Sequence, residues 1–325
     1  MKVAFLLPRI DRPAGGHAII VEHIRILREN GIDACAVFSG GVEVSYYENH
    51  LPQAALGHAK AIGDRESYLV IPEADLSRYA DFVLQARGND FSRVIILNQN
   101  HFYTFNHRDD PVSWRVFRNA KHVGTSRAIA SFLRDITGST VPVVPVFIRH
   151  DIFRPAPKLL RIAYMPRKRP EDARFLRRAV HEIAPDQRVI EWIEIDNKSQ
   201  EEVADILNAS AVFVSLARRE GFGMPALEAM AAGCLVVGFT GGGGDEYAAD
   251  DNGLWTEEGD MVALATAVVR LCRDLVTGAP HLRDISRNAQ YRASVYTRSR
   301  TEVALMEAWS NISGNSFVTN RGATI

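Results

Sequence analysis

The sequence predicts an α/β protein with two Rossmann-like domains that face a central cleft. Apolar runs of strand length alternate along the chain with amphipathic helical stretches, which is typical of parallel β-α-β units with helices on both faces of the sheet. The chain has 325 residues, about twice the usual length of a domain, so each half can bury its own core. A proline-punctuated stretch at residues 146–157 interrupts the periodicity and predicts a linker.

The expected elements follow from length, periodicity and turn residues. In the first half we expect strands at 2–8, 34–39, 68–71, 93–98, 122–124 and 141–146, and helices at 18–29, 74–86 and 126–137. In the second half we expect strands at 161–165, 188–193, 211–216 and 235–239, and helices at 171–183, 200–208, 225–232 and 261–274. Ligands of such sheets bind outside the carboxyl ends of the strands. Because the linker is predicted at residues 146–157, the first domain is expected to span residues 1–153 and the second residues 154–295.

Composition excludes several classes of protein. Basic and acidic residues nearly balance, 38 against 39, so no overall basic excess indicates a nucleic-acid partner. The three cysteines are scattered and indicate neither a disulfide framework nor a metal site. The apolar segment at residues 1–8 meets a Gly/Pro turn too early for a signal peptide, and no run approaches membrane-spanning length. We therefore expect a cytoplasmic protein.

Residues 219–233 place a carboxylate where packing alone would not favour one. Pro225 predicts the start of a helix, because proline suits the first helical position. Glu220 then lies on the preceding loop, and Glu228 lies in the first turn among alanine, leucine and methionine. A carboxylate in such a helix is costly to bury without hydrogen bonds. Glu228 is therefore a candidate binder of ligand hydroxyl groups, although two glutamates at an arbitrary spacing are usually surface residues.

This segment resembles the GT-B retaining glycosyltransferases of family 4, the glycosyl transferases of group 1. Their signature is a pair of glutamates separated by seven residues, matched here by Glu220 and Glu228. The resemblance implies that Glu228 binds the ribose hydroxyls of a nucleotide and that Glu220 lies beside the transferred sugar. Residues between them, Gly221, Phe222 and Gly223, are assigned to the same nucleotide-sugar site. It also implies that residues 296–325 hold a C-terminal helix that crosses back to the first domain, followed by a tail.

Two glycine turns are candidates for contact with the donor. Gly15 and Gly16 precede the first helix, where backbone N–H groups favour an anion. The dinucleotide fingerprint G-x-G-x-x-G is absent, and an ordinary strand-to-helix turn is the alternative. The run from Gly241 to Gly244 is costly in conformational entropy unless the backbone passes close to something, so Gly242, Gly243 and Gly244 are expected near the phosphates or the sugar. A merely flexible loop is the alternative there.

Two polar residues follow strands of the first domain. His101 follows an apolar strand and resembles the family histidine that contacts the transferred sugar, although a lone histidine is more often a packed or solvated residue. Ser126 is first of all a helix N-cap.

Cations follow the first strand of the second domain. Arg167 is the best match to the family arginine that holds the diphosphate, because a guanidinium can bind two phosphate oxygens at once. The sequence departs from the family at Pro166, which replaces a glycine, and at Asp172, which stands where a lysine is usual. The lysine role then moves to Lys168, Arg169 or Arg174, or is lost. A solvated loop is the alternative.

The resemblance implies a retaining, metal-independent hexosyltransferase that needs no cofactor and takes a nucleoside diphosphate sugar as donor. No convincing Asp-x-Asp pattern is present, and the Asp109-Asp110 and Asp250-Asp251 pairs fit solvated loops. A glycan or lipid-linked acceptor in polysaccharide biosynthesis follows by analogy, and a lipid-linked acceptor would imply peripheral contact with the inner face of the membrane. A sugar-nucleotide epimerase, a phosphorylase and a noncatalytic binding subunit remain alternatives on the same fold. The base, the sugar, the acceptor, the oligomeric state and any role of Glu246 stay open.

Overall fold

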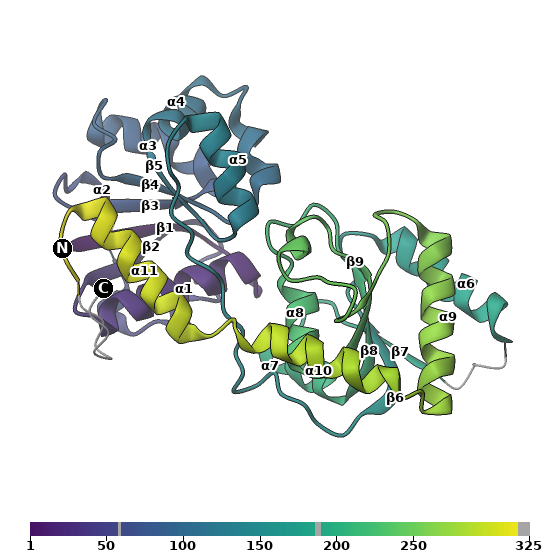
Figure 1. The fold of residues 1–325 in the computed structure, drawn as a ribbon. Coiled ribbons are helices and arrows are strands. Elements are labelled where there is room, and N and C mark those ends of the chain that lie inside the picture. Colours follow the sequence, from purple (N-terminus) through teal and green to yellow (C-terminus); the bar gives the residue numbers. More distant parts are fainter. Residues whose placement is uncertain (58–59, 186–189, 318–325) are drawn as a thin grey trace. The chain divides into compact units, whose positions relative to one another are not determined.

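The computed structural model describes residues 1–57, 60–185 and 190–317, and it divides the chain into two units (Figure 1). Unit 1 comprises Met1–Val146 together with the C-terminal segment that begins at Ser299. Unit 2 comprises Phe147–Arg298. The sequence placed these boundaries after residues 153 and 295. The tail beyond residue 317 lies outside the described residues.

Each unit is built on a five-stranded sheet in which every described strand pair is parallel. The strands of unit 1 are β1 (Lys2–Arg9), β2 (Asp33–Gly41), β3 (Tyr68–Pro72), β4 (Val94–Asn98) and β5 (Lys121–Gly124), in the order β2-β1-β3-β4-β5. Those of unit 2 are β6 (Leu159–Tyr164), β7 (Glu191–Glu194), β8 (Ser210–Leu216), β9 (Leu235–Phe239) and β10 (Leu254–Trp255), in the order β10-β9-β8-β6-β7. In both sheets the first strand lies between the second and the third. The strand order reverses there, and the loops that leave the first and third strands become neighbours.

The sheet of unit 1 is covered by helices on both faces. Its helices are α1 (Gly15–Glu29), α2 (Lys60–Gly63), α3 (Leu76–Arg87), α4 (Pro111–Asn119), α5 (Arg127–Thr137) and α11 (Arg298–Ser313). Alternate residues of β1 point to opposite faces. Phe5 and Leu7 share a core cluster with residues of α1 and α11, whereas Leu6 shares one with residues of α3, α4 and α5. The α/β/α layering predicted from the apolar runs is confirmed.

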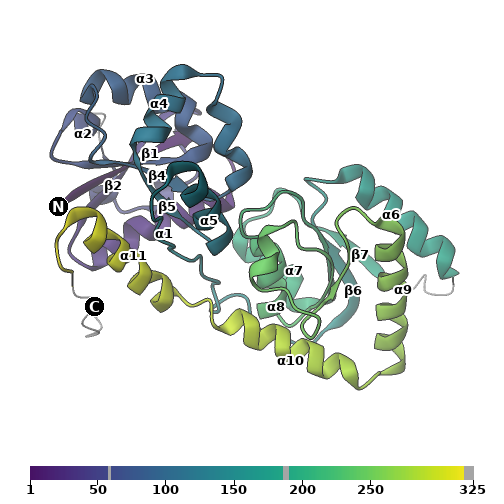
Figure 2. The ribbon, with the colours of Figure 1, turned by 45° about the horizontal axis from the view of Figure 1, so that its top comes forward.

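Helix α11 is part of unit 1 although it follows unit 2 in the sequence, and it runs beside α1 in both views (Figures 1 and 2). Leu305, Met306 and Trp309 are buried in the same cluster as α1. The Trp309 ring also meets the Tyr68 ring of β3 edge to face, with 5.4 Å between centroids. The last helix thus closes one face of the first sheet.

Unit 2 has helices α6 (Pro170–Ile183), α7 (Gln200–Ala209), α8 (Met224–Ala231), α9 (Met261–Thr277) and α10 (His281–Ser294). Helices α6 and α9 lie side by side and share a core cluster with Val212 and Val214 of β8 (Figure 1). Helix α8 packs against α7 and α10. The Lys158 ammonium, just before β6, donates hydrogen bonds to Leu207 O at 3.0 Å in α7 and to Ala232 O at 2.6 Å after α8. A partly buried cation therefore holds the carboxyl ends of two helices, where cations are favoured.

Several expectations for the elements need correction. The strand expected at 141–146 is wrong, because Val143 forms only an isolated bridge with Gly124. Pro142 and Pro145 have no N–H to continue a ladder. Helices α4 and α10 were not predicted from the sequence. The strand expected at 188–193 is seen as β7, and residues 188–189 lie outside the described residues.

Candidate functional site

In unit 2 the loops that follow β6 and β8 meet at the point where the strand order reverses. Lys168 follows β6, Glu220 follows β8, and the Lys168 ammonium lies 2.7 Å from a Glu220 carboxylate oxygen. The same ammonium donates to the carbonyl of Arg218 at 3.1 Å. Both side chains stay partly accessible, 25% and 21% exposed. The structure therefore brings together two of the predicted site residues and links them by charge.

The loop after β8 has an unusual backbone. Arg219, next to Glu220, has a positive φ of 49°, and such outliers cluster at functional sites. The Glu220 N–H donates to Gly241 O at 2.9 Å. Gly223 has a φ of 86° at the cap of α8, and its carbonyl accepts a hydrogen bond from the buried Tyr247 hydroxyl. Tyr247, which the sequence did not mark, fixes the entry into the helix.

Glu228 lies inside unit 2, on helix α8. The helix begins at Met224, one residue before the expected Pro225, and Ala226, Leu227 and Ala229 around the glutamate are buried. Glu228 itself is only 7% exposed. Burial raises its pKa to about 7, and a hydrogen bond with the Gln200 side chain acts in the opposite direction. Within the described residues no ion pair involves Glu228. The carboxyl group predicted to bind hydroxyls is thus buried without a cation.

The glycine run after β9 packs against the Glu220 loop. A Cβ on Gly243 would lie 2.4 Å from Phe222 N, so only glycine fits there. The N–H groups of Gly242 and Gly244 donate to the hydroxyl and carbonyl of Thr240, at 3.3 and 3.0 Å. The predicted close approach is therefore made to the protein itself, and two of the amides expected to face an anion are used within the turn. A part in donor binding stays a prediction for these glycines.

In unit 1 the turn after β1 meets the segment after β4. Helix α1 begins at Gly15, earlier than expected, and no side chain caps it. The Gln99 side-chain amide donates to Gly16 O at 2.9 Å, and a Cβ on Gly16 would lie 2.4 Å from Gln99 Oε1. Nothing lies within 4 Å of a Cβ built on Gly15. The two glycines therefore differ: a side chain on Gly16 would displace the end of Gln99, whereas the space beside Gly15 is open.

His101 is the first residue of the 3-10 helix η4 (His101–His107). It lies two positions after Gln99, whose side chain binds Gly16. Its ring packs beside Phe102 and Phe132, with centroids 4.3 and 5.5 Å away. Its Nδ1 atom is buried without a hydrogen-bond partner among the described residues, and burial lowers the pKa of the imidazole. His101 is thus a neutral imidazole with an unused nitrogen near neutral pH.

Comparison with known proteins identifies the chemistry. Residues 159–274, from β6 into α9, match the family model described as glycosyl transferases group 1. An alpha-1,6-glucosyltransferase of Actinobacillus pleuropneumoniae serotype 7 (strain AP76) is 29% identical over 287 residues, 83% of each chain. The chain is a glycosyltransferase. An N-acetyl-alpha-D-glucosaminyl L-malate synthase of Bacillus anthracis is 34% identical over 106 residues, 32% of this chain and 26% of that protein.

Solved structures show that this glycosyltransferase has the GT-B fold. Anabaena HepE in complex with UDP and glucose matches with a TM-score of 0.68 at 14% identity, over 96% of this chain and all of that one. Sucrose-phosphate synthase from Thermosynechococcus elongatus also gives 0.68, at 15% identity over 97% of this chain and all of that one. The two parallel five-stranded sheets of this chain, which have the same strand order as each other, agree with the predicted fold class.

The cations of the glycosyltransferase divide into paired and exposed groups. Arg169 pairs with Asp172 at 2.8 Å and with Glu258, and its guanidinium stacks over Phe239. Asp172, which departs from the family pattern, is therefore a partner of Arg169. Arg167 is exposed, and none of the ion pairs between described residues includes it. Arg167 and Lys168, which is partly exposed but already binds Glu220, are the cations of this loop that remain candidates for a ligand.

Sequence reasoning missed Glu73, the first residue after β3 in unit 1. Its side chain is 2% exposed, and burial raises its pKa to about 8. One carboxyl oxygen accepts hydrogen bonds from the N–H groups of Gln99 and Asn100, at 2.8 and 2.7 Å. An acidic residue directly after a buried strand was the available signal. Ser126 caps α5 as predicted, accepting from Ile129 N at 3.2 Å.

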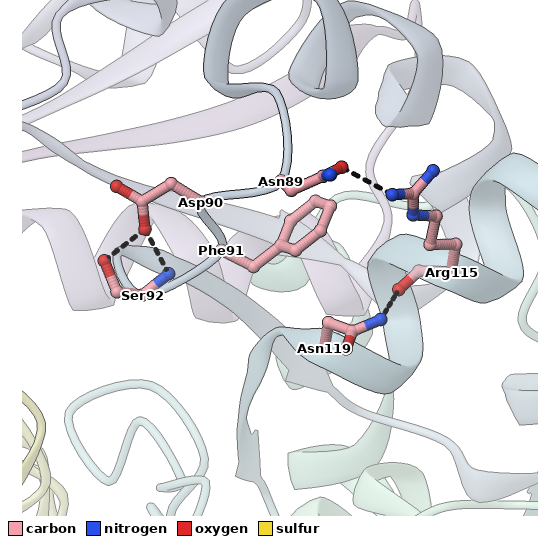
Figure 3. A pocket seen from close by; sticks show the side chains of 6 residues that line it. All are labelled: Asn89, Asp90, Phe91, Ser92, Arg115 and Asn119. Carbon is pink, nitrogen blue, oxygen red and sulfur yellow. Dashed lines mark hydrogen bonds between the residues drawn. The ribbon is translucent and has the colours of Figure 1, made fainter.

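A hollow on unit 1 lies away from the predicted site (Figure 3). It is lined by Asn89, Asp90, Phe91, Ser92, Arg115 and Asn119. These residues precede β4 or lie on α4, whereas Gln99 and His101 follow the carboxyl end of β4. Asn89 binds the Arg115 guanidinium, and Asp90 accepts from the Ser92 N–H and hydroxyl. The lining groups bind one another, so the hollow has no evident part in the chemistry.

Among the described residues, no three or more His, Cys, Asp or Glu side chains are grouped to hold a metal ion. Within the same residues, no helix combines the length and the apolar character needed to cross a bilayer.

Proposed function

We propose that the protein is a retaining hexosyltransferase that moves a hexose from a nucleoside diphosphate to an acceptor hydroxyl of a glycan or lipid-linked oligosaccharide. The observation that carries the proposal is Glu228, a carboxyl group buried in an apolar helix without a cationic partner among the described residues. Such a group is costly unless hydrogen-bond donors reach it. The vicinal hydroxyls of a ribose supply two.

The first donor to test is UDP-glucose. Anabaena HepE, which shares the fold, has been solved with UDP-glucose, and the relative from Actinobacillus pleuropneumoniae is named as a glucosyltransferase. The family model for glycosyl transferases group 1 matches residues 159–274. This segment contains Glu228, the ion pair of Lys168 with Glu220, and the glycines at 241–244. We therefore place the nucleotide in unit 2 and extend the proposal to glucose.

Catalysis in this proposal is mainly electrostatic. The leaving diphosphate gains negative charge in the transition state, and fixed cations beside it are expected to supply the largest stabilisation. Arg167 can bind two phosphate oxygens, and Lys168 is held in place by Glu220 at 2.7 Å. Because these cations can balance the charge, we propose that the reaction needs neither a metal ion nor a cofactor.

Glu220 and His101 are assigned to the transferred sugar. Glu220 steadies the positive charge that spreads over the sugar ring, and it also orients Lys168. The His101 ring is partly exposed, and we propose that its accessible edge meets a sugar hydroxyl. The departing phosphate oxygen takes the acceptor proton on the same face of the sugar, so retention follows without a separate protein base. A lipid-linked acceptor would bring the enzyme to the inner face of the membrane as a peripheral protein.

Thermal unfolding with nucleotides tests the proposal. UDP, GDP and dTDP are each added at millimolar concentration, and at least one should raise Tm by mass action. Glu228→Ala should abolish that rise, whereas Glu302→Ala, which alters another buried glutamate in α11, should retain it. A protein whose Tm responds to none of the three nucleotides would contradict the use of a UDP, GDP or dTDP sugar as donor.

Product analysis tests the reaction itself. With UDP-glucose, EDTA and a glycan acceptor, NMR should show an α-configured product from an α-configured donor. An inverted product would exclude retention, and loss of turnover in EDTA would exclude metal independence. Release of an epimerised nucleotide sugar without acceptor would indicate an epimerase, and a requirement for inorganic phosphate would indicate a phosphorylase.

A further inference from the structure

The segment that carries His101 is held at both ends by one residue. Glu73 Oε1 accepts the N–H groups of Gln99 and Asn100, at 2.8 and 2.7 Å, just before η4. The carbonyl of Glu73 accepts a hydrogen bond from His107 Nε2 at 2.6 Å, at the last residue of η4. His107 is buried, so this second bond is also inside the protein. Residues 99–107 are therefore clamped to the end of β3.

The strand register explains why Glu73 reaches this segment. In the parallel pair of β3 and β4, Pro72 lies opposite Leu97. Glu73, the residue after Pro72, therefore leaves the sheet beside the end of β4. A residue with a shorter side chain at position 73 would leave two main-chain N–H groups in the interior without an acceptor.

The clamped segment carries two groups of the predicted site. Gln99 donates its side-chain amide to Gly16 O in the first glycine turn. His101 follows two residues later, with its Nδ1 buried and without a partner among the described residues. Asn100 supplies an internal link, because its side-chain oxygen accepts from Phe102 N at 3.1 Å. A shift of the main chain at residues 99–100 would therefore move both the turn and the imidazole.

We propose that Glu73 is a positioning residue for the transfer reaction: it fixes residues 99–107 so that His101 and the Gly15-Gly16 turn keep their places. The inference rests on the proposed function in one respect, the role of His101 at the sugar. Glu73 itself touches neither sugar nor nucleotide. It acts through the main chain, in the manner of outer residues that orient reacting groups.

The chemistry of the clamp requires an acceptor but not a charge. Both N–H groups bind the same oxygen, Oε1, and Oε2 is buried with no hydrogen-bond partner among the described residues. Burial raises the pKa of Glu73 to about 8, which favours the neutral acid at pH 7. A glutamine side chain offers one acceptor oxygen of the same reach. Glu73→Gln should therefore preserve the clamp, and Glu73→Leu should break it.

Steady-state kinetics with UDP-glucose provide the first test. Glu73→Leu should lower kcat by about 10-fold to 100-fold, since misplacement of a reacting group by about 1 Å can cost that much. Its KM for the donor and its Tm response to UDP should stay within about threefold of the unmodified protein. Glu73→Gln should recover most of the lost kcat. A Glu73→Leu variant with unchanged kcat would overturn the proposal, as would a Glu73→Gln variant no better than Glu73→Leu.

The titration of His101 provides a second test that does not depend on turnover. Histidine side chains are labelled, and His101→Gln identifies the His101 resonance by its loss. In the unmodified protein, burial lowers the His101 pKa. In Glu73→Leu, the freed ring should titrate closer to the ordinary value of about 6.5, whereas in Glu73→Gln it should stay low. An unchanged His101 titration in Glu73→Leu would refute the clamp even if the protein proved to catalyse another reaction.

His107→Leu guards against a Glu73→Leu variant that does not fold. It removes the second anchor and leaves the Glu73 carboxyl group in place. The His101 titration and kcat should move in the same direction as in Glu73→Leu, by a smaller amount. A folded His107→Leu protein with both properties unchanged would remove the second anchor from the proposal. An absence of transfer by the unmodified protein, with the His101 shifts as expected, would instead reject the proposed function and keep the clamp.

Discussion

Unit 1 and unit 2 each bury a glutamate near the carboxyl ends of their strands, but the two carboxyl groups have different neighbours. Glu73 accepts two main-chain hydrogen bonds through one oxygen. For Glu228, burial raises the pKa, and a hydrogen bond with the Gln200 side chain is the contact that lowers it. Burial raises both pKa values, to about 8 and about 7. Burial and pKa alone therefore do not separate Glu73, which binds the main chain, from Glu228, which we propose binds a ligand; the two differ in their hydrogen-bond partners.

The largest expected difference between the two glutamates is in nucleotide affinity. Glu228→Ala should weaken UDP binding by about 100-fold, because one or two hydrogen bonds to a charged group, each worth about 1.5–3 kcal/mol, are lost. Glu73→Gln should change the UDP dissociation constant by less than about threefold. Isothermal titration calorimetry measures both. Similar losses in the two variants would erase the proposed distinction.

Stability without ligand should show the opposite order. Glu73→Met leaves two buried N–H groups without an acceptor and should lower the free energy of unfolding by about 2 kcal/mol or more. Glu228→Met replaces a buried acid by an apolar side chain of similar length and removes one hydrogen bond, with Gln200, so it should cost about 1 kcal/mol or less. Urea unfolding at pH 7 compares them. A Glu228→Met protein as unstable as Glu73→Met would mean that unit 2 also uses its carboxyl group for structure.

The pH dependence of stability should sharpen the comparison further. Both carboxyl groups have folded-state pKa values above the unfolded value of about 4.3, so their contribution to stability is greatest at low pH and is lost as pH rises through the folded pKa. The loss is complete near pH 7 for Glu228 and near pH 8 for Glu73. Both groups should therefore lower the Tm of the unmodified protein between pH 5 and pH 8. Glu73→Gln should make the decrease of Tm with pH shallower up to pH 8, and Glu228→Gln should do so only up to pH 7. An unchanged dependence of Tm on pH in both variants would contradict both assignments.

The smallest expected effect on stability concerns the ion pair between Lys168 and Glu220, which lies in the same unit as Glu228. Lys168→Met breaks a partly exposed pair with Glu220 and should change the free energy of unfolding by less than about 1 kcal/mol. Lys198→Met, which breaks the exposed pair with Glu202, is the matched control. Only Lys168→Met should also lower the transfer rate. Equal transfer rates in the two variants would remove Lys168 from the diphosphate site.

The sequence predicted the strands and helices best where apolar runs were uninterrupted. The last buried strand of the second half, Leu235–Phe239, was predicted to the residue. The strand expected at 141–146 failed because two prolines, Pro142 and Pro145, interrupt its apolar residues and have no N–H group to donate to a neighbouring strand. Helix α10 was missed because few of its residues are buried, chiefly Leu282, Ala289 and Ala293, which leaves a weak apolar stripe.

The candidate site was predictable where its signal was local. Glu220 and Glu228 lie eight positions apart in one motif, so one sequence window contained them. Glu73 was missed because its partners, Gln99 and Asn100, are 26 and 27 positions away, and only the pairing of β3 with β4 brings them together. The glycine run was noticed for its cost, but the neighbour that requires Gly243 is the Phe222 main chain. Contacts of this kind depend on register, which composition does not reveal.

Helix α11 has a consequence for how the chain folds as it is synthesised. The first sheet is translated early, but the side chains that cover one of its faces, Leu305, Met306 and Trp309, are translated after all of unit 2. Unit 2 is continuous in sequence and can collapse as soon as it leaves the ribosome. Helix α1 covers only part of that face, so unit 1 must wait with the rest of it uncovered, and the half made first is the half completed last. Chaperones that shield nascent apolar surfaces should therefore engage the N-terminal half for longer than the half that follows it.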